Sequence, residues 1–157
     1  LYPHLTGAEN LAFYGRLYGL DDLGTRINRR AREVGIADRL EDLVGNYSSG
    51  MQRRLALART LLHDPALVIL DEPFAGVDPG GMEELEGMLG KLRDTGQTVV
   101  MATHHLEEGF RLGDRVMVLV SGRAVFTGET ARMNSDDFRR QYALSTQNPP
   151  LAAAAVP

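Results

Sequence analysis

Two adjacent carboxylates, Asp71 and Glu72, directly follow an apolar run over residues 66–70. Such a pair at the end of a buried strand is costly unless it serves a function. The first carboxylate could hold a Mg²⁺ ion through water, and the second could orient or deprotonate an attacking water molecule. The alternative is a pair of solvated acids in a turn. The apolar run directly before the pair favours the functional interpretation.

A second candidate is the segment Ser48-Ser49-Gly50, which opens a predicted helix. The free N–H groups at a helix N-terminus suit a phosphate, serine hydroxyls add donors, and glycine permits close approach of the backbone. Serine is also a favoured N-cap, and for this segment taken alone the structural interpretation is the stronger one. Three arginines between positions 53 and 59 follow on that helix, and their structural interpretation is a solvated face.

The third candidate is the pair His104 and His105, which follows a second apolar run over residues 97–102. A histidine at a strand end could hydrogen-bond a phosphate oxygen and sense its loss. A histidine in a surface loop is the commoner case. His4 and His63 do not have the spacing of zinc ligands, so we expect no metal site built from histidine.

The elements that must position these residues change in character at Pro65. A capping box at Thr6 and Glu9 opens an all-helical segment before it, and Asp78 is a natural N-cap after it. Short apolar runs after Pro65 are typical of strands buried on both faces of a parallel sheet. The expected helices are 2–20, 21–34, 36–45 (a short helix or turn), 51–62, 79–94, 105–112 and 136–142. The expected strands are 66–70, 97–102, 115–120 and 123–127, the last two joined by a hairpin at Ser121-Gly122.

Alternating strands and helices predict a mainly parallel sheet covered by helices. Ligands of such sheets bind outside the carboxyl ends of the strands. Asp71-Glu72 and Thr103-His104-His105 both follow strands, so we expect them to meet at one edge of the sheet.

The composition sets limits on the class of protein. The chain has 157 residues, 43% of them hydrophobic and 24% charged, which is ordinary for a globular domain. Its net charge of -4 argues against a nucleic-acid-binding module, and it has no cysteine. The lysine at position 91 is the only one and precedes Leu92, so the sequence contains no Gly-Lys-Ser/Thr phosphate-binding loop.

Taken in order, these segments resemble the second half of an ABC transporter ATPase domain. Residues 47–54 resemble the family signature, and residues 67–73 resemble the Walker B strand with its catalytic glutamate. Residues 75–78 resemble the D-loop, and Thr103-His104 resembles the switch-histidine loop. Each motif alone is weak, but four in register are specific, and they cover the chain up to about Gly128.

The resemblance implies a role for each residue. Asp71 would help to hold Mg²⁺, Glu72 would polarise the attacking water, and His104 would contact the γ-phosphate of ATP. Further nucleotide-binding residues, which face ATP held by the opposite subunit, would be Ser48, Ser49, Gly50, Met51 and Asp78.

The implied fold is a P-loop NTPase-like α/β domain with a mainly parallel sheet and an N-terminal helical subdomain. We expect residues 1–62 to form the helical subdomain, residues 63–130 the second half of the α/β core, and residues 131–157 a C-terminal helix and tail. The implied function is that of the ATP-binding subunit of an ABC transporter. ATP and Mg²⁺ would bind between two head-to-tail ATPase domains and drive a transmembrane permease subunit from the cytoplasmic face of the membrane.

Departures from the common motif indicate the subfamily. Tyr47, Ser49 and Met51 stand where the common signature has Leu, Gly and Gln, as in exporter-type ATPases for drugs, polysaccharides or haem. Walker A, the adenine-stacking aromatic and the Q-loop would all lie upstream of Leu1. We therefore expect a C-terminal portion of an ATPase domain that hydrolyses ATP poorly or not at all alone. Uncovered apolar faces and sheet edges predict self-association, which light scattering would detect.

Two other classes stay open. One is a soluble ABC-type ATPase in translation or DNA repair, although such proteins tend to carry two nucleotide domains or long coiled-coil insertions, and neither is visible. The other is a non-catalytic interaction module. The sequence does not indicate the transported substrate, because in this family the membrane subunit selects it.

Overall fold

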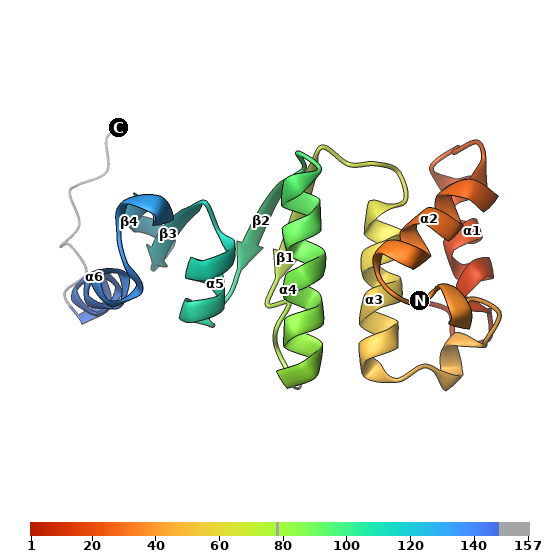
Figure 1. The fold of residues 1–157 in the computed structure, drawn as a ribbon, viewed down its shortest axis with the longest axis horizontal. Coiled ribbons are helices and arrows are strands. Elements are labelled where there is room, and N and C mark those ends of the chain that lie inside the picture. The colour runs from red at the N-terminus through yellow and green to blue at the C-terminus, as the bar shows by residue number, and fades with distance from the viewer. Residues whose placement is uncertain (78, 148–157) are drawn as a thin grey trace. The chain divides into compact units, whose positions relative to one another are not determined.

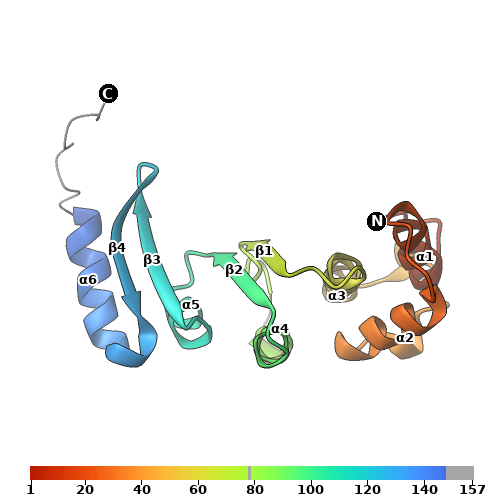
Figure 2. The same ribbon diagram turned by 90° about the horizontal axis from the view of Figure 1, so that it is seen from above.

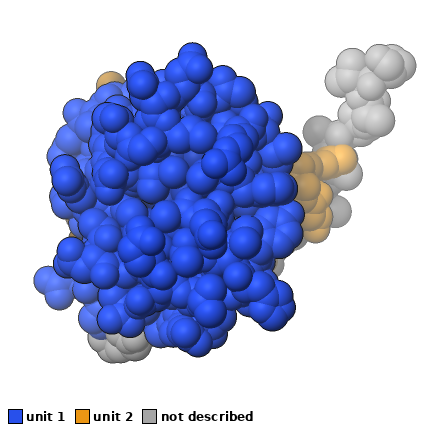
Figure 3. Space-filling model, turned by 90° about the vertical axis from the view of Figure 1, so that its right-hand side faces the viewer, with its two compact units in different colours: residues 1–70, 74–100 blue, residues 71–73, 101–157 orange. Residues whose placement is uncertain are grey.

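The computed structural model describes residues 1–77 and 79–147 (Figure 1). The contacts among these residues divide them into two compact units (Figure 3). Unit 1 comprises Leu1–Leu70 and Phe74–Val100, and unit 2 comprises Asp71–Pro73 and the residues from Met101 onward. In chain order the elements, with η for a 3₁₀ turn, are α1 (Gly7–Leu17), α2 (Leu23–Glu33), η1 (Ala37–Arg39), η2 (Val44–Asn46), α3 (Ser49–Leu61), β1 (Leu67–Asp71), α4 (Pro79–Asp94), β2 (Thr98–Ala102), α5 (Leu106–Leu112), β3 (Arg115–Val120), β4 (Arg123–Glu129), η3 (Thr130–Arg132) and α6 (Ser135–Gln147).

Helix α1 begins at the predicted capping box. The Glu9 N–H donates to Thr6 Oγ1 at 3.1 Å, and the Thr6 N–H donates to Glu9 Oε2 at 2.8 Å. The expected helical start at residue 2 is wrong, and the buried Asn10 gives the reason. Its side chain accepts from the Tyr2 N–H at 2.8 Å and donates to the Tyr2 carbonyl at 2.9 Å. These bonds satisfy the backbone N–H and carbonyl groups of Tyr2 without a helix, so the helix begins later in the chain.

Helix α2 is tied to the end of α3 by an ion-pair cluster around Asp64. Arg26 Nη1 lies 2.5 Å from Asp64 Oδ2, Arg29 Nη2 lies 2.6 Å from Asp64 Oδ1, and the buried Arg30 also donates to Asp64. Burial raises the pKa of Asp64, but the hydrogen bond from Arg26 and the charges of all three arginines outweigh it. The pKa of Asp64 is therefore below its usual value.

The strands form two pairs. β1 and β2 run parallel, because the Thr98 N–H donates to the Ala66 carbonyl at 3.2 Å and the Glu72 N–H donates to the Ala102 carbonyl at 2.8 Å. β3 and β4 pair antiparallel. Ser121 and Gly122 connect them with φ values of 49° and 77°, so the predicted hairpin is confirmed. The α/β class with parallel strands is likewise confirmed.

The expectation that strand β1 is buried on both faces is wrong for the residues that the structure describes. Val68 is buried, but Leu67 and Ile69 are 49% and 69% exposed, and Val100 on β2 is 52% exposed. Figure 2 shows α4 along one face of this strand pair, which accounts for the one-sided burial. Alternate residues of a strand point to opposite faces, so the apolar run leaves its odd-numbered residues open. Self-association through such a face stays a prediction.

Gly7 offers a test of the helical packing. A Cβ atom at this position would lie 2.3 Å from Tyr47 Oη and 3.2 Å from the Leu40 carbonyl oxygen. Tyr47 is held there by burial, which raises its pKa, and by donation of its hydroxyl to the Arg39 carbonyl at 2.6 Å. We therefore expect Gly7→Ala to lower the free energy of unfolding by about 1–3 kcal/mol, measured by urea denaturation.

The matched control for this substitution is Gly24→Ala in α2, where an added Cβ meets nothing within 4 Å. That change should raise the free energy of unfolding by up to about 1 kcal/mol, because alanine is the better helix former. In a Tyr47→Phe background the cost of Gly7→Ala should shrink, since the clashing oxygen is gone. Equal losses at Gly7 and Gly24 would contradict this account of the packing.

Candidate functional site

Glu72 and His104 form a close pair beyond the ends of β1 and β2. His104 Nδ1 lies 2.8 Å from Glu72 Oε2, and the His104 N–H donates to Glu72 Oε1 at 3.1 Å. Glu72 itself has φ of 45°, in the left-handed region, where a residue with a side chain is strained by about 1–3 kcal/mol. The turn at Glu72 therefore joins its carboxylate to the backbone and the ring of the loop after β2. The expected meeting of these two strand ends is confirmed.

The pair constrains the protonation of His104. A carboxylate can only accept, so Nδ1 must carry the proton that is donated to Glu72. Nε2 is then an acceptor in the neutral ring and a donor in the imidazolium. Donation from Nε2 to a phosphate oxygen while Nδ1 remains bonded to Glu72 consequently requires the imidazolium form. The His104 side chain is 70% exposed, so its ring is open to a ligand.

The hydrogen bond from the His104 side chain is the main cause that lowers the pKa of Glu72, and burial opposes it to a smaller degree. Glu72 is thus held as a carboxylate, the form needed to accept a proton or orient water. Because its pKa is lowered, the pair favours the folded state above the ordinary carboxyl pKa. This contribution is lost as the pH falls through the lowered pKa of Glu72.

Asp71 is the last residue of β1 and has an exposed side chain. No group of three or more His, Cys, Asp or Glu side chains within residues 1–77 and 79–147 is arranged to hold a metal ion. Mg²⁺ in nucleotide enzymes is commonly bound by one or two carboxylates together with substrate phosphates. A single exposed carboxylate at this strand end fits that pattern.

The second part of the candidate site is the N-terminus of α3. Ser48 is its N-cap and accepts from the Met51 N–H at 3.2 Å, so the structural interpretation of this serine is confirmed. Ser48, Ser49 and Gly50 are all exposed. A Cβ on Gly50 would meet nothing nearer than Ser48 Oγ at 3.9 Å, so the backbone is open to a ligand. Binding of phosphate at this helix end stays a prediction.

The structural interpretation of the α3 arginines as a solvated face is wrong. Arg53 donates to the Ala75 carbonyl at 2.8 Å, Arg54 pairs with Glu84 of α4, and the Arg59 guanidinium lies 4.7 Å from the centre of the Tyr14 ring. They join α3 to the segment after Glu72, to α4 and to α1. Sequence reasoning missed these contacts, because nothing local marks partners that lie about 20 to 45 residues apart.

The remaining predicted residue, Asp78, lies outside the described residues. Asp71, Glu72 and His104 belong to unit 2, whereas Ser48, Ser49, Gly50 and Met51 belong to unit 1. The structure therefore brings together the members of each group.

Comparisons with known proteins agree with this arrangement. A family model described as "ABC transporter" matches residues 1–75. The linearmycin resistance ATP-binding protein LnrL of Bacillus subtilis is 37% identical over 132 residues, which are 82% of this chain and 42% of that protein. The daunorubicin/doxorubicin resistance ATP-binding protein DrrA of Streptomyces peucetius is 38% identical over 135 residues, 83% of this chain and 40% of that protein.

A solved structure shows the same likeness in three dimensions. It is cbiO1 from Clostridium perfringens, described as part of the ABC transporter complex cbiONQ. It superposes with a TM-score of 0.76 at 26% identity, over 94% of this chain and 59% of that one. The chain spans about half the length of the curated relatives it matches.

The histidine–glutamate pair can be tested by titration. In a His104→Ala variant, the pKa of Glu72 should rise towards the ordinary glutamate value, because the ring hydrogen bond that lowers it is lost. The measurement is a pH titration of the Glu72 side-chain carboxyl signal by carbon NMR. His63→Ala, which changes a histidine stacked on Tyr18, is the control and should leave the Glu72 titration unchanged. An unmoved Glu72 in His104→Ala would show that the pair does not persist in solution.

Proposed function

Because this chain belongs to the family of ABC transporter ATP-binding proteins, we propose that it supplies the signature helix and the water-activating pair of an ATPase that drives export. The observation that carries the proposal is the Glu72–His104 pair at the end of a parallel strand. Two of the relatives are named for resistance to linearmycin and to daunorubicin/doxorubicin, and we take these names as support for export over import. The whole protein's substrate is not indicated by any of these residues.

In this proposal Glu72 is the base that orients the attacking water. Both of its oxygens are engaged by His104, through the backbone N–H and through Nδ1. Each carboxylate oxygen keeps a further lone pair and the Glu72 side chain is 37% exposed, so a water molecule can bind beside these bonds. If a phosphate draws the ring of His104 to itself, Oε2 gains one more acceptor site for the water. His104 would thus link the presence of the phosphate to the number of acceptor sites that Glu72 offers to water.

Asp71 would hold the Mg²⁺ of the nucleotide, with the remaining ligands supplied by phosphates and water. The ion would neutralise charge that develops on the transferred phosphoryl group. Ser48, Ser49, Gly50 and Met51 would bind the phosphates of ATP presented by a second ATPase domain, since the helix N-terminus offers unpaired N–H groups. Asp78 would act across the same interface.

The membrane partner is proposed to dock on the exposed apolar residues on and beside α1, namely Tyr2, Phe13, Leu17 and Tyr18. Leu17 is 67% exposed, and Tyr2 packs edge-on against Phe13 with ring centres 5.1 Å apart. Exposed apolar groups that gather on one part of a surface mark an interaction site. The partner would be a transmembrane permease subunit, which would place the chain at the cytoplasmic face of the membrane. No helix within the described residues is both long enough and apolar enough to cross a bilayer.

The catalytic proposal is tested in a chimera that joins the P-loop half of an ABC ATPase domain to Leu1. We expect this chimera to hydrolyse ATP, and Glu72→Gln to reduce the rate at least about a hundredfold while ATP binding is retained, because the amide cannot accept the proton of water. Steady-state phosphate release and calorimetric ATP binding are the measurements.

Glu83→Gln, which neutralises an exposed glutamate on α4, is the matched control and should leave the rate within twofold. The chain without the added half should bind no Mg-ATP detectably, since its 157 residues contain no Gly-Lys-Ser/Thr motif. Undiminished hydrolysis in Glu72→Gln would refute the assigned role. Tight Mg-ATP binding by the chain alone would refute the dependence on a P-loop.

The docking proposal predicts a separation of coupling from catalysis. Phe13→Ser with Leu17→Ser should weaken association with the permease about tenfold or more, because two exposed apolar side chains leave the contact. The rate of ATP hydrolysis by the chimera should not change. Co-purification with the permease in detergent and phosphate release measure the two effects. Retained association would show that the permease docks elsewhere on the chain. Failure of the unsubstituted chimera to associate with a permease would favour the alternatives of a soluble ATPase or a non-catalytic interaction module.

A further inference from the structure

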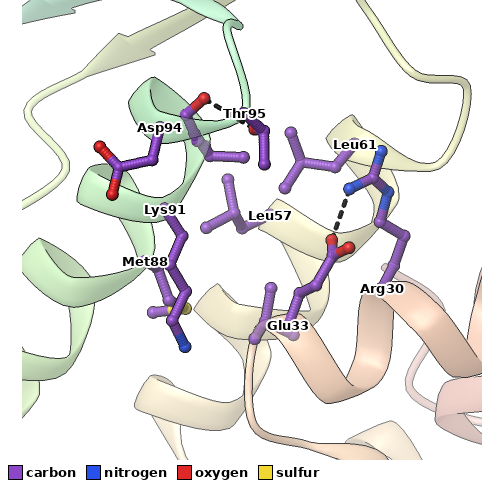
Figure 4. Close-up of a pocket in the computed structure, with 10 residues that line it drawn as sticks. Arg30, Glu33, Leu57, Leu61, Met88, Lys91, Asp94 and Thr95 are labelled. Atoms are coloured by element: carbon purple, nitrogen blue, oxygen red, sulfur yellow. Dashed lines mark hydrogen bonds and ion pairs between the residues drawn. The ribbon is translucent and has the colours of Figure 1, made fainter.

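A pocket of about 300 Å³ lies between α2, α3 and α4, entirely within unit 1. Figure 4 shows Met88 and Lys91 of α4 on one side and Arg30 and Glu33 of α2 on the other, with Leu57 of α3 between them. This volume is at the lower end of the range for sites that bind small molecules. The pocket can hold a small ligand that touches all three helices.

The walls of the pocket are mainly apolar. Four of the lining side chains are apolar and almost fully buried, namely Val34, Leu57, Leu61 and Leu92. The side chain of Met88 adds a flexible, polarizable wall that adapts to different shapes. The body of a ligand in this space must therefore be apolar.

The charged residues around the pocket leave one positive group without a partner. Glu33 pairs with Arg30 and Arg29, and Asp94 lies 3.6 Å from Arg93 Nε. Lys91 lines the pocket, is exposed, and forms no ion pair or hydrogen bond through its side chain with any described residue. Both acids have cationic partners. The remaining unpaired charge at this pocket is the positive charge of Lys91, which would attract an anion.

Arg30 is a fixed part of the pocket wall. Its side chain is 7% exposed and donates to Glu33 and Asp64 through its terminal nitrogens. Its Nε has no hydrogen-bond partner among the described residues, but it has almost no accessible surface, so a ligand in the pocket cannot reach it. The anion-binding group of this pocket is therefore Lys91 rather than Arg30.

We propose that this pocket binds a small amphiphile with an apolar body and a single carboxylate, with the carboxylate at Lys91. A cation in the last turn of α4 interacts favourably with the helix dipole, and both Lys91 and Arg93 lie there. Arg93 does not line the pocket, so the helix dipole alone does not account for the place of Lys91 in its wall. The site includes neither the Glu72–His104 pair nor the N-terminus of α3. Binding at this site would therefore be a function additional to nucleotide chemistry, and its test does not depend on the proposed ATPase role.

The test uses decanoate as the probe and the complete 157-residue chain. Because Lys91 is the only lysine, an amine-reactive reagent reports on this one side chain, apart from the terminal amine. Decanoate should slow the labelling of Lys91 about fivefold or more, as read by peptide mass spectrometry. In an Arg140→Lys variant, the added lysine on exposed α6 is an internal reference and should be labelled at an unchanged rate. Unslowed labelling of Lys91 in the unmodified chain would overturn the proposal.

Calorimetry with variants then locates the two parts of the ligand. Lys91→Met keeps the aliphatic stem and should weaken decanoate binding about fivefold to tenfold, whereas Arg93→Met removes the same charge from outside the pocket and should change it less than twofold. Met88→Trp should abolish binding by filling the space. Decylamine, with the opposite charge, should bind more weakly than decanoate. If neither Lys91→Met nor Met88→Trp alters decanoate binding, the ligand binds outside this pocket and the proposal is wrong.

Discussion

The candidate site depends on one backbone hydrogen bond, from the Glu72 N–H to the Ala102 carbonyl. This bond sets the end of β1 beside the end of β2, so the residues that follow each strand must share the same edge. The left-handed turn at Glu72 costs free energy, and that cost is offset by hydrogen bonds to Ala102 at the end of β2 and to His104 in the loop after it. A strained residue that is held by several bonds has a defined orientation, which is what a base that positions water requires.

The same bonds that orient Glu72 use only part of its acceptor capacity. Each carboxylate oxygen is bonded to His104 and keeps a further lone pair, so Glu72 is preorganised and can still accept from water. Its lowered pKa keeps it charged, so no proton has to be lost before it can accept one. Under the proposed function, a phosphate that competes for the histidine ring would free one more acceptor site on Glu72, so water activation would respond to bound phosphate.

Local patterns in the sequence predicted the elements of this structure well, and they predicted contacts poorly. The capping box at Thr6, the N-cap at Ser48 and the hairpin at Ser121-Gly122 involve residues at most three apart, so their chemistry is visible in the chain. The strand-end pair was predictable because parallel strands place their carboxyl ends together. The bonds from Arg53 to Ala75 and from Arg54 to Glu84 were not, because they join residues brought close only by folding.

The apolar run of β1 shows a further limit of such patterns. A continuous apolar run predicts burial on both faces of a strand, but it does not indicate which residues pack against each face. In the described residues one face of β1 lies along α4, while the face with Leu67 and Ile69 is open. Exposure of these side chains costs free energy that a covering surface would recover, at about 25 cal/mol for each Å² removed from water. The apolar sequence of β1 is therefore suited to burial on both faces of the strand, whereas the described residues cover only one of them.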